Sequence, residues 1–386
     1  MIKSFYKNNS LTLGILGGGQ LAKMLALSAY RLGLNVAIID KEAGTPAGDM
    51  TKLEFTKGWE NSSELDKFIE VSDIVTLENE FIAPEILEYI AQKRQVFPSA
   101  KTMRLIQDKF IQKSVFAENN IELPDFNAIA SIEDMLAFGK KYSYPFIVKT
   151  RTLGYDGYGN FTVYSESDCK TAFDKFQKPD VKRDLMAERF IDFQAELAVM
   201  VARNKQGEIA VYPCVESIQK NHICHKVIAP ARISKELANK AKEIAVKCVK
   251  VIDGVGVFGV ELFLTKDNRI LINEIAPRPH NSGHYTIEAC YTSQYENAIR
   301  AILGLPLGST DMLLNGACMI NILGEKEGSS IPVDITKSLE NGKTSLHLYN
   351  KKQSRVGRKI GHVTAVANSV EEAIENANDM VKKIVW

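Results

Sequence analysis

Short apolar runs alternate with amphipathic patterns over the first hundred residues. Leu11–Leu16 is one such run; Gly17-Gly18-Gly19-Gln20 follows it, and a helical pattern continues to Gly33. A second run, Asn35–Ile39, ends at Asp40. Runs of this length between helical segments predict strands of a parallel sheet with helices on its faces.

The glycine turn fits the fingerprint G-x-G-x-x-G/A, with Asp40 near the place of the acid that binds a ribose in dinucleotide-binding folds. Taken literally, the turn favours NAD. The glycines themselves establish only a tight turn with backbone amides at a helix N-terminus, which suits any small anion.

Polar side chains follow the strands of this first sheet. A third strand, Ser72–Leu77, leads into Glu78-Asn79-Glu80; a helix at Pro84–Gln92 and a strand at Gln95–Pro98 come next. Ligands of open parallel sheets bind beyond the carboxyl ends of the strands. Four side chains would share that rim: Gln20, Asp40, Glu78 and Glu80. They suit a substrate with amines and hydroxyls, although one of the two glutamates could simply begin the next helix.

A glycine-rich segment between two strands marks the middle of the chain. Residues 106–125 predict an amphipathic helix and a turn, which lead into a smaller α/β unit over about 125–190. Its strand Pro145–Lys149 precedes Thr150–Asn160, and the strand Phe161–Tyr164 follows. Such a loop can present amides to an anion, with Lys149 as a phosphate clamp, but it also fits an ordinary surface turn.

Further strands follow this unit. Leu185–Phe190 predicts a strand, and Glu196–Arg203 with Glu208–Pro213 predicts a hairpin. A strand that runs into a short connector exposes backbone groups that can pair with adenine, and Glu196 could hold ribose hydroxyls. Ser234–Ile252 has a long helical pattern.

A second hairpin carries two acids among apolar neighbours. Val257–Leu264 and Arg269–Ile275 flank a turn at residues 266–268, with Glu261 on one strand and Glu274 on the other. Carboxylates inside buried strands are costly unless a cation compensates them. The pair therefore suggests a hard metal such as Mg²⁺, which takes one or two carboxylates plus phosphate oxygens. The alternative is that both glutamates face solvent.

The last part of the chain predicts a small β-rich unit with a closing helix. Its strands are Ala317–Ile322, Thr344–Tyr349 and His362–Ala367, and its helix is Ser369–Val385; a helix at Gln294–Leu303 precedes them. Between the last two strands, five basic residues fall within positions 351–359. This loop fits either a solvated charge run or a phosphate site.

Composition narrows the class of protein. The chain has 386 residues, 45% of them hydrophobic and 25% charged, with a formal net charge of +1, so no global charge indicates nucleic acid or an acidic membrane as a partner. Six cysteines without a CxxC pair, no signal peptide and no long apolar segment predict a cytoplasmic protein with reduced thiols. His222-x-x-His225 with Cys224 lacks a second ligand pair, which argues against zinc.

The order of these motifs resembles the ATP-grasp superfamily. Within it, GGGQLAKM (17–24), TRTLGYDGYGN (150–160), NEIAPRPHNSGH (273–284) and GRKIGH (357–362) are similar to the N5-carboxyaminoimidazole ribonucleotide synthetase family over almost the whole chain. The resemblance implies an α/β fold with an N-terminal Rossmann-like, pre-ATP-grasp domain (1–108), an ATP-grasp domain (109–305, lid about 125–190) and a C-terminal β-rich domain (306–386).

The resemblance also implies an activity: ATP-dependent carboxylation of 5-aminoimidazole ribonucleotide by bicarbonate through carboxyphosphate, in purine biosynthesis, by a cytoplasmic homodimer. The implied ATP contacts are Lys109, Lys149, Gly154, Tyr155, Asp156, Gly157, Tyr158, Gly159, Asn160, Glu188, Arg189, Phe190, Ile191, Glu196, Asn273 and Glu274. The implied ligands of Mg²⁺ (or Mn²⁺) are Glu261 and Glu274. The implied residues around bicarbonate and carboxyphosphate are Arg278, His280 and Asn281. The implied contacts to the acceptor nucleotide are Tyr155, Asp156, Lys351 and Arg358, and the rim residues Gln20, Asp40 and Glu78 join them.

Two positions depart from the family pattern. Tyr158 stands where the flap usually has a basic residue or similar, and Gln219 stands where a histidine is expected near the nucleotide, with His222 or His225 as candidate substitutes.

Three competing functions remain. One is an NAD-dependent oxidoreductase, one is a catalytically silent nucleotide-binding protein on the same scaffold, and one is another ATP-grasp carboxylase or formate ligase with a different acceptor.

Overall fold

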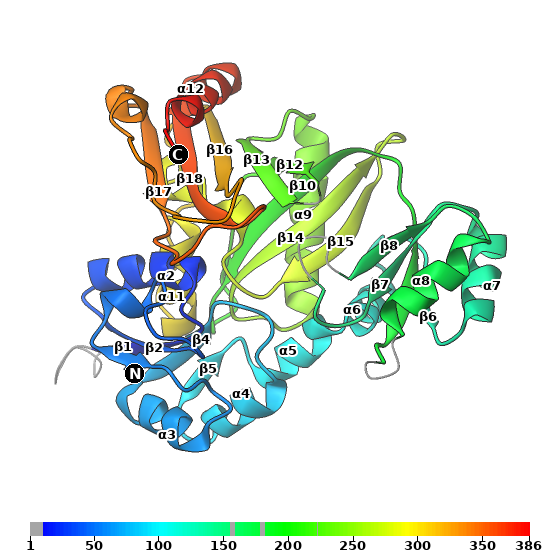
Figure 1. Ribbon diagram of the computed structural model, residues 1–386, viewed down its shortest axis with the longest axis horizontal. Coiled ribbons are helices and arrows are strands. Elements are labelled where there is room, and N and C mark those ends of the chain that lie inside the picture. Colours follow the sequence, from blue (N-terminus) through cyan, green and yellow to red (C-terminus); the bar gives the residue numbers. More distant parts are fainter. Residues whose placement is uncertain (1–10, 155–158, 178–181, 222) are drawn as a thin grey trace.

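The computed structural model describes residues 11–154, 159–177, 182–221 and 223–386 (Figure 1).

The first of the three sheets in these residues is parallel. The strand order in this sheet is β3-β2-β1-β4-β5. Its strands are β1 (Thr12–Leu16), β2 (Asn35–Ile39), β3 (Leu53–Phe55), β4 (Ile74–Leu77) and β5 (Gln95–Phe97). Its helical elements are α2 (Gln20–Arg31), η1 (Gly48–Met50), α3 (Ser62–Val71), α4 (Pro84–Ala91) and α5 (Ala100–Gln107). Leu13 and Ile38 are fully buried because helices cover both faces, so the predicted parallel α/β unit is confirmed.

The helix predicted within residues 106–125 is confirmed as α6, but it begins at Lys109, later than predicted. α5 ends at Gln107, and a separate helix, α6, runs over Lys109–Glu118. Asp108 has extended backbone angles, and its carboxylate accepts hydrogen bonds from the amides of Phe110 (2.8 Å) and Ile111 (3.2 Å). A short acidic side chain is better placed as a helix cap than in a helix interior, so it begins a new helix here.

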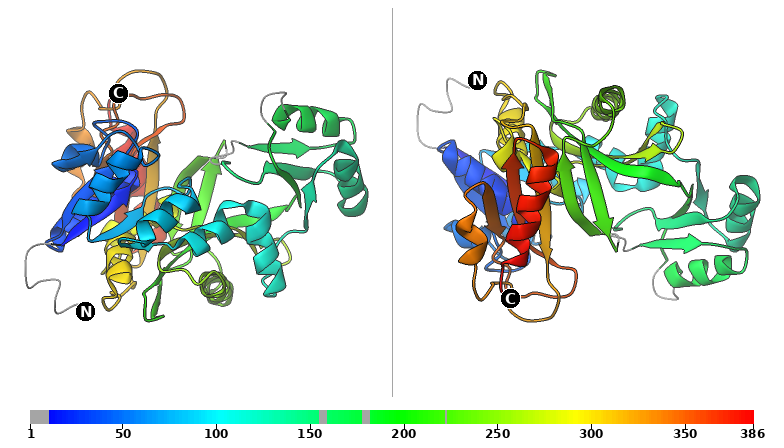
Figure 2. Two further views of the ribbon diagram at one scale, coloured as in Figure 1. Left: turned by 90° about the horizontal axis from the view of Figure 1, so that it is seen from below. Right: turned by 90° about the horizontal axis from the view of Figure 1, so that it is seen from above.

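A four-stranded antiparallel sheet forms the second unit, at one end of the molecule (Figures 1 and 2). Its order is β6-β9-β7-β8. Its elements are β6 (Phe126–Ile129), α7 (Ile132–Tyr142), β7 (Phe146–Thr150), β8 (Asn160–Val163), α8 (Asp168–Phe176) and β9 (Leu185–Arg189). Ser131 and Asp134 start α7 with reciprocal side-chain-to-backbone bonds.

The third sheet has nine strands and continues into the C-terminal part of the chain. Its order is β15-β14-β10-β12-β13-β16-β18-β17, with β11 on β10. Its strands are β10 (Phe193–Arg203), β11 (Ile209–Val211), β12 (Val215–Lys220), β13 (Ile223–Ala229), β14 (Gly256–Thr265), β15 (Ile270–Ala276), β16 (Gly316–Leu323), β17 (Thr344–Leu348) and β18 (Lys359–Ala367). β13 and β16 pair antiparallel, with Lys226 opposite Ile320. The last strands therefore extend the central sheet.

Helices pack on this large sheet. They are α9 (Lys235–Val251), α10 (Thr286–Ala289), α11 (Gln294–Leu303) and α12 (Val370–Lys382), with 3₁₀ turns η2 (Asn281–Gly283) and η3 (Lys337–Glu340). Ala245 and Val249 of α9 are fully buried in one core with Phe258 and Ile272 of the sheet.

The loop with the basic residues, called the basic loop here, covers residues 349–358. It is shorter than predicted because β18 begins at Lys359. No helix within the described ranges is long and apolar enough to span a membrane.

Candidate active site

The start of α6 is fixed to the base of the glycine-rich loop. The Arg151 guanidinium donates to both carboxylate oxygens of Asp108, with a shortest contact of 2.6 Å. The backbone amide of Lys109 also donates to the carbonyl of Arg151 at 2.8 Å. Lys109 is thereby held where strand β7 ends, and its ammonium group pairs with the Glu274 carboxylate across the site. This arrangement brings together two residues that are far apart in sequence.

Two buried lysines share one buried glutamate. The ammonium nitrogens of Lys149 and Lys113 lie 3.0 and 3.1 Å from Glu188 Oε2. Burial alone would raise the pKa of Glu188, but the two lysines lower it. Burial, together with the neighbouring Lys149, lowers the pKa of Lys113 to about 8 even though Glu188 opposes this effect. Lys149 and Glu188 were predicted from the sequence, whereas Lys113 was missed. Its signal is the spacing of four residues from Lys109, which places both lysines on one face of α6.

We expect Lys113→Met to destabilise the protein by about 3 kcal/mol, because loss of one partner leaves a buried charge less compensated. Urea unfolding followed by circular dichroism measures this change. Lys240→Met is the matched control: Lys240 makes an exposed, 3.7 Å ion pair with Glu122, so its loss should cost less than about 1 kcal/mol. An equal loss of unfolding free energy in the two variants would show that the buried Lys113 ion pair stabilises the protein no more than the exposed Lys240 pair.

Glu261 and Glu274 lie directly opposite each other on β14 and β15. Burial, and then the Glu274 and Glu196 carboxylates, raise the pKa of Glu261. The pKa of Glu274 is lowered by Lys109. Two carboxylates held in register with opposite pKa shifts form an electrostatically frustrated pair that a divalent cation would relieve. The expectation that both side chains face the solvent does not fit this arrangement.

A β-bulge brings Asn273 beside this pair. The register shifts immediately after Glu261, so Leu262 pairs with Ile272 and Asn273 is an extra residue in β15. Asn273 and Glu274 are consecutive half-buried positions, and Asn273 Oδ1 is buried without a hydrogen-bond partner in the part of the chain that the structure describes. A buried amide oxygen without a partner is costly and indicates a missing ligand.

These oxygens fit a hard cation. The described ranges contain no group of three or more His, Cys, Asp or Glu side chains arranged as a metal site. Two carboxylates and one amide oxygen match Mg²⁺, which takes its remaining ligands from phosphate and water oxygens. The set does not suit zinc, which prefers nitrogen and sulfur.

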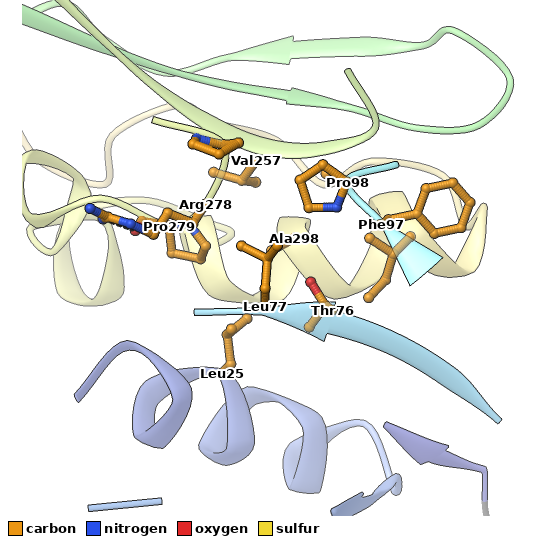
Figure 3. Close-up of a pocket in the computed structure, with 12 residues that line it drawn as sticks. Leu25, Thr76, Leu77, Phe97, Pro98, Val257, Arg278, Pro279 and Ala298 are labelled. Carbon is orange, nitrogen blue, oxygen red and sulfur yellow. Dashed lines mark hydrogen bonds between the residues drawn. The ribbon is translucent and has the colours of Figure 1, made fainter. Parts of the chain in front are cut away.

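The segment after β15 packs against β14 and the first sheet. A Cβ atom on Gly259 would lie 2.5 Å from the Cβ of His280, so only glycine allows this approach. His280 Nε2 lies 3.5 Å from Glu261, and burial, then Arg278, lowers the pKa of His280 to about 4. The Arg278 guanidinium is bound by both carboxylate oxygens of Glu80. A small, largely apolar pocket beside Arg278 and Pro279 separates them from β4 and β5 (Figure 3).

The glycine turn of the first sheet is filled by carboxylates of the same domain. The Gly18 amide donates to Asp40 at 2.7 Å. The Gly19 and Ala22 amides donate to Glu78 at 2.6 and 3.1 Å. These three amides are therefore not available to a pyrophosphate, which argues against the NAD interpretation. Gln20 begins α2 beside them, so the predicted rim exists.

The basic loop contains a half-buried cation, Lys351, that forms no ion pair among the described residues. Burial, then Arg358, lowers the pKa of Lys351 to about 8, although the Glu78 carboxylate opposes this shift. Its ammonium group lies 5.9 Å from the Tyr349 ring centroid, and no ion pair of Lys351 occurs among the described residues. Lys352 donates to the carbonyl of Ala43, and Lys23 donates to that of Leu348 at 3.1 Å. The loop is thus tied to the first domain, and Lys23 is a neighbouring cation that sequence reasoning missed.

The remaining predicted nucleotide contacts lie around β9 and the glycine-rich loop. Arg189 pairs with Asp125 at 3.5 Å, and Phe190 is 41% exposed where the strand meets its connector before Ile191. Burial raises the pKa of Glu196, and a hydrogen bond from Gln219 opposes this shift. Gly154, Gly159 and Asn160 flank the loop, whereas Tyr155, Asp156, Gly157 and Tyr158 lie outside the described residues, as does His222.

Three family models match successive parts of the chain. They are the ribonucleotide synthetase preATP-grasp domain (10–107), the ATP-grasp domain (114–295) and the phosphoribosylaminoimidazole carboxylase C-terminal domain (317–376).

Named relatives cover nearly the whole chain. Phosphoribosylaminoimidazole carboxylase of Candida albicans is 42% identical over 95% of the chain, which spans only 65% of that protein. N5-carboxyaminoimidazole ribonucleotide synthase of Bacillus subtilis is 34% identical over 94% of this chain and 93% of its own length. The Aspergillus clavatus N5-carboxyaminoimidazole synthase, solved with ADP and 5-aminoimidazole ribonucleotide, is 35% identical, with a TM-score of 0.88 over 97% of this chain and 98% of that one.

Proposed function

Because the chain belongs to the N5-carboxyaminoimidazole ribonucleotide synthase family of ATP-grasp proteins, we propose that it carboxylates 5-aminoimidazole ribonucleotide with bicarbonate and ATP. The products are N5-carboxyaminoimidazole ribonucleotide, ADP and phosphate, within de novo purine synthesis. The observation that carries the proposal is Lys351, a half-buried cation that forms no ion pair among the described residues, on a loop apart from the carboxylate pair. Lys351 and the carboxylate pair, Glu261 and Glu274, would thus serve two different phosphorylated substrates.

ATP would lie between the small antiparallel sheet and the nine-stranded sheet. Lys109 and Lys149 offer ammonium groups that can move from Glu274 and Glu188 onto phosphate oxygens. Phe190 offers an exposed ring at the strand end, and Glu196 a carboxylate for the ribose. Glu261, Glu274 and Asn273 would hold Mg²⁺ or Mn²⁺, which neutralises the charge that develops during phosphoryl transfer.

Bicarbonate would be activated beside residues 278–281. An oxygen of bicarbonate attacks the γ-phosphorus of ATP, the bond to the bridging oxygen breaks, and ADP leaves with the electron pair. Arg278 keeps its charge while bound to Glu80, so it can stabilise the carboxyphosphate anion. His280, neutral because of its lowered pKa, can orient the anion through Nε2 without bringing a second charge.

The acceptor would bind between the first domain and the basic loop. Its phosphate would contact Lys351 and Arg358, and its amine and ribose would face Gln20, Asp40 and Glu78, with Tyr155 and Asp156 from the flap. The amine attacks the carboxyl carbon of carboxyphosphate, or the CO₂ that it releases, and inorganic phosphate departs. A closed flap would protect carboxyphosphate from water.

We expect ADP release that depends on both bicarbonate and 5-aminoimidazole ribonucleotide. A coupled assay for ADP, run with each substrate omitted in turn, measures this dependence. Equal ADP release with and without the aminoimidazole nucleotide would reject the substrate. It would favour another ATP-grasp carboxylase or formate ligase, for which the basic loop offers no evident role.

The remaining parts of the proposal rest on the family alone. They are a homodimer, a cytoplasmic location and the division into domains at 108 and 305.

A further inference from the structure

A row of polar side chains on the C-terminal strands faces the segment that follows β15. Asn321 of β16 is the cross-strand neighbour of His362 of β18, and His362 is the neighbour of His347 of β17. Opposite them stand Asn281, His284 and Glu288. Their spacing of three and four residues places these three on one side of the helical turns η2 and α10. Each residue of the row contacts one residue of the segment.

The first contact is an amide pair. Asn281 Nδ2 donates to Asn321 Oδ1 at 3.0 Å, and Asn321 Nδ2 donates to Asn281 Oδ1 at 2.5 Å. Asn321 also donates to the carbonyl of Cys224 at 2.8 Å. Asn281 and Asn321 are 8% and 3% exposed, so few other partners can reach these groups. Asn281 is therefore oriented by a residue forty positions away.

The second and third contacts involve histidines. The rings of His284 and His362 are fully buried with centroids 4.8 Å apart, and His362 stacks on His347 at 4.3 Å. Tyrosine hydroxyls bind the Nδ1 atoms of His284 (2.9 Å) and His362 (2.8 Å). His347 Nε2 contacts Glu288 Oε1 at 2.6 Å. Each of the three histidine rings is therefore held by a hydrogen bond.

Two of these strands, β17 and β18, flank the basic loop. β17 and β18 are joined by the loop that holds Lys351 and Arg358; His347 lies four residues before Lys351, and His362 lies four after Arg358. The strands that flank the basic loop are therefore the strands that contact the segment, and Arg278 and His280 lie at the start of that segment.

We propose that Asn321, His362 and His347 are positioning residues, which set the geometry of residues 278–281 and make it respond to the acceptor on the basic loop. This inference rests on the proposed function for the identity of the acceptor. Preorganised groups lose about a hundredfold in rate when displaced by about 1 Å, so a modest shift of Asn281 has a large effect.

A role in stability alone predicts a different result. If Asn321, His362 and His347 contribute only to packing, their replacement should lower ADP release and the unfolding midpoint together. If it positions, kcat with the acceptor should fall while the KM values for ATP and the acceptor stay nearly constant.

Asn321→Leu tests the inference, since leucine has a similar volume but cannot form either amide bond. We expect kcat of acceptor-dependent ADP release to fall about tenfold or more, with both KM values within about twofold. Asn376→Leu is the matched control because it removes another amide pair, Asn341 to Asn376 at 2.9 Å, within the same part of the chain. Equal kcat values for the two variants would overturn the proposal.

A milder pair of variants covers the case in which Asn321→Leu does not fold. The His347 side chain is 24% exposed and thus tolerates change. His347→Leu should lower kcat about threefold, and His347→Gln, which keeps a donor for Glu288, should restore it. Equal values for both would contradict a positioning role.

Hydrogen exchange separates this inference from the proposed function, because it requires no turnover. We expect 5-aminoimidazole ribonucleotide to slow amide exchange in residues 280–289 of the wild type by about tenfold, and to do so less in Asn321→Leu. Acceptor-dependent ADP release without any change in exchange would overturn the coupling and leave the function standing. Absence of acceptor-dependent ADP release, with slower exchange present, would reject the function and retain the coupling.

Discussion

Replacement of Glu274 by glutamine is expected to lower ATP-dependent turnover by about a thousandfold while leaving the fold intact. The substitution keeps the shape of the side chain but removes the charge that faces Glu261 and Lys109. A metal ion would then lose one of two carboxylates, and Lys109 would lose the partner that holds it in place. The Glu274 side chain is 37% exposed, so the change should affect stability little.

The measurement is ADP release at saturating substrates, with circular dichroism as the check on folding. Glu122→Gln serves as a control, since Glu122 is a half-exposed acid in an ion pair outside the candidate site. Turnover at the wild-type rate in Glu274→Gln would remove Glu274 from the metal site and with it the mechanism proposed above.

Replacement of Lys351 by methionine should raise the KM for 5-aminoimidazole ribonucleotide about a hundredfold, which corresponds to the loss of one strong charge-assisted contact to phosphate. Burial already disfavours the Lys351 ammonium, whose pKa is lowered to about 8, so an apolar chain of similar length fits its surroundings. The KM for ATP should not change, because the proposed ATP contacts lie on other strands.

Initial rates at varied acceptor concentrations give both constants. Lys343→Met is the control within the same region, since Lys343 pairs with Glu372 at 3.0 Å on the surface. If Lys351→Met and Arg358→Met both keep the wild-type KM for the acceptor, the basic loop does not bind the acceptor phosphate.

The sequence predicts well those features that depend on neighbouring residues. Continuous apolar runs such as Asn35–Ile39 correspond to buried strands, and the turn at 266–268 joins β14 and β15 as predicted. The resemblance to the ATP-grasp superfamily is confirmed by the family models. Each strand or turn signal lies within one short stretch of chain, and the resemblance rests on several such stretches in a fixed order.

Features that depend on distant residues could not be predicted. The C-terminal strands extend the central sheet because β13 pairs with β16, and no local pattern specifies that partner. Asn321 appears in the sequence as one polar residue in an apolar strand, and its role depends on Asn281 from another part of the fold. The exact start of α6 was missed for a different reason: it depends on the Asp108 side chain, which caps the first amides of the helix, and apolar spacing does not show such a cap.

Because of the register shift in β15, the number of residues in this strand affects which side chains reach the candidate metal site. Side chains alternate between faces along a regular strand, so a one-residue slip moves every later side chain to the other face. Asn273 is the extra residue that lets it and Glu274 remain together opposite Glu261. A chain with both glutamates but without this extra residue would keep Glu274 opposite Glu261 and would lose the unpartnered amide oxygen beside them. The bulge therefore adds a third oxygen to the carboxylate pair without adding a third acidic residue.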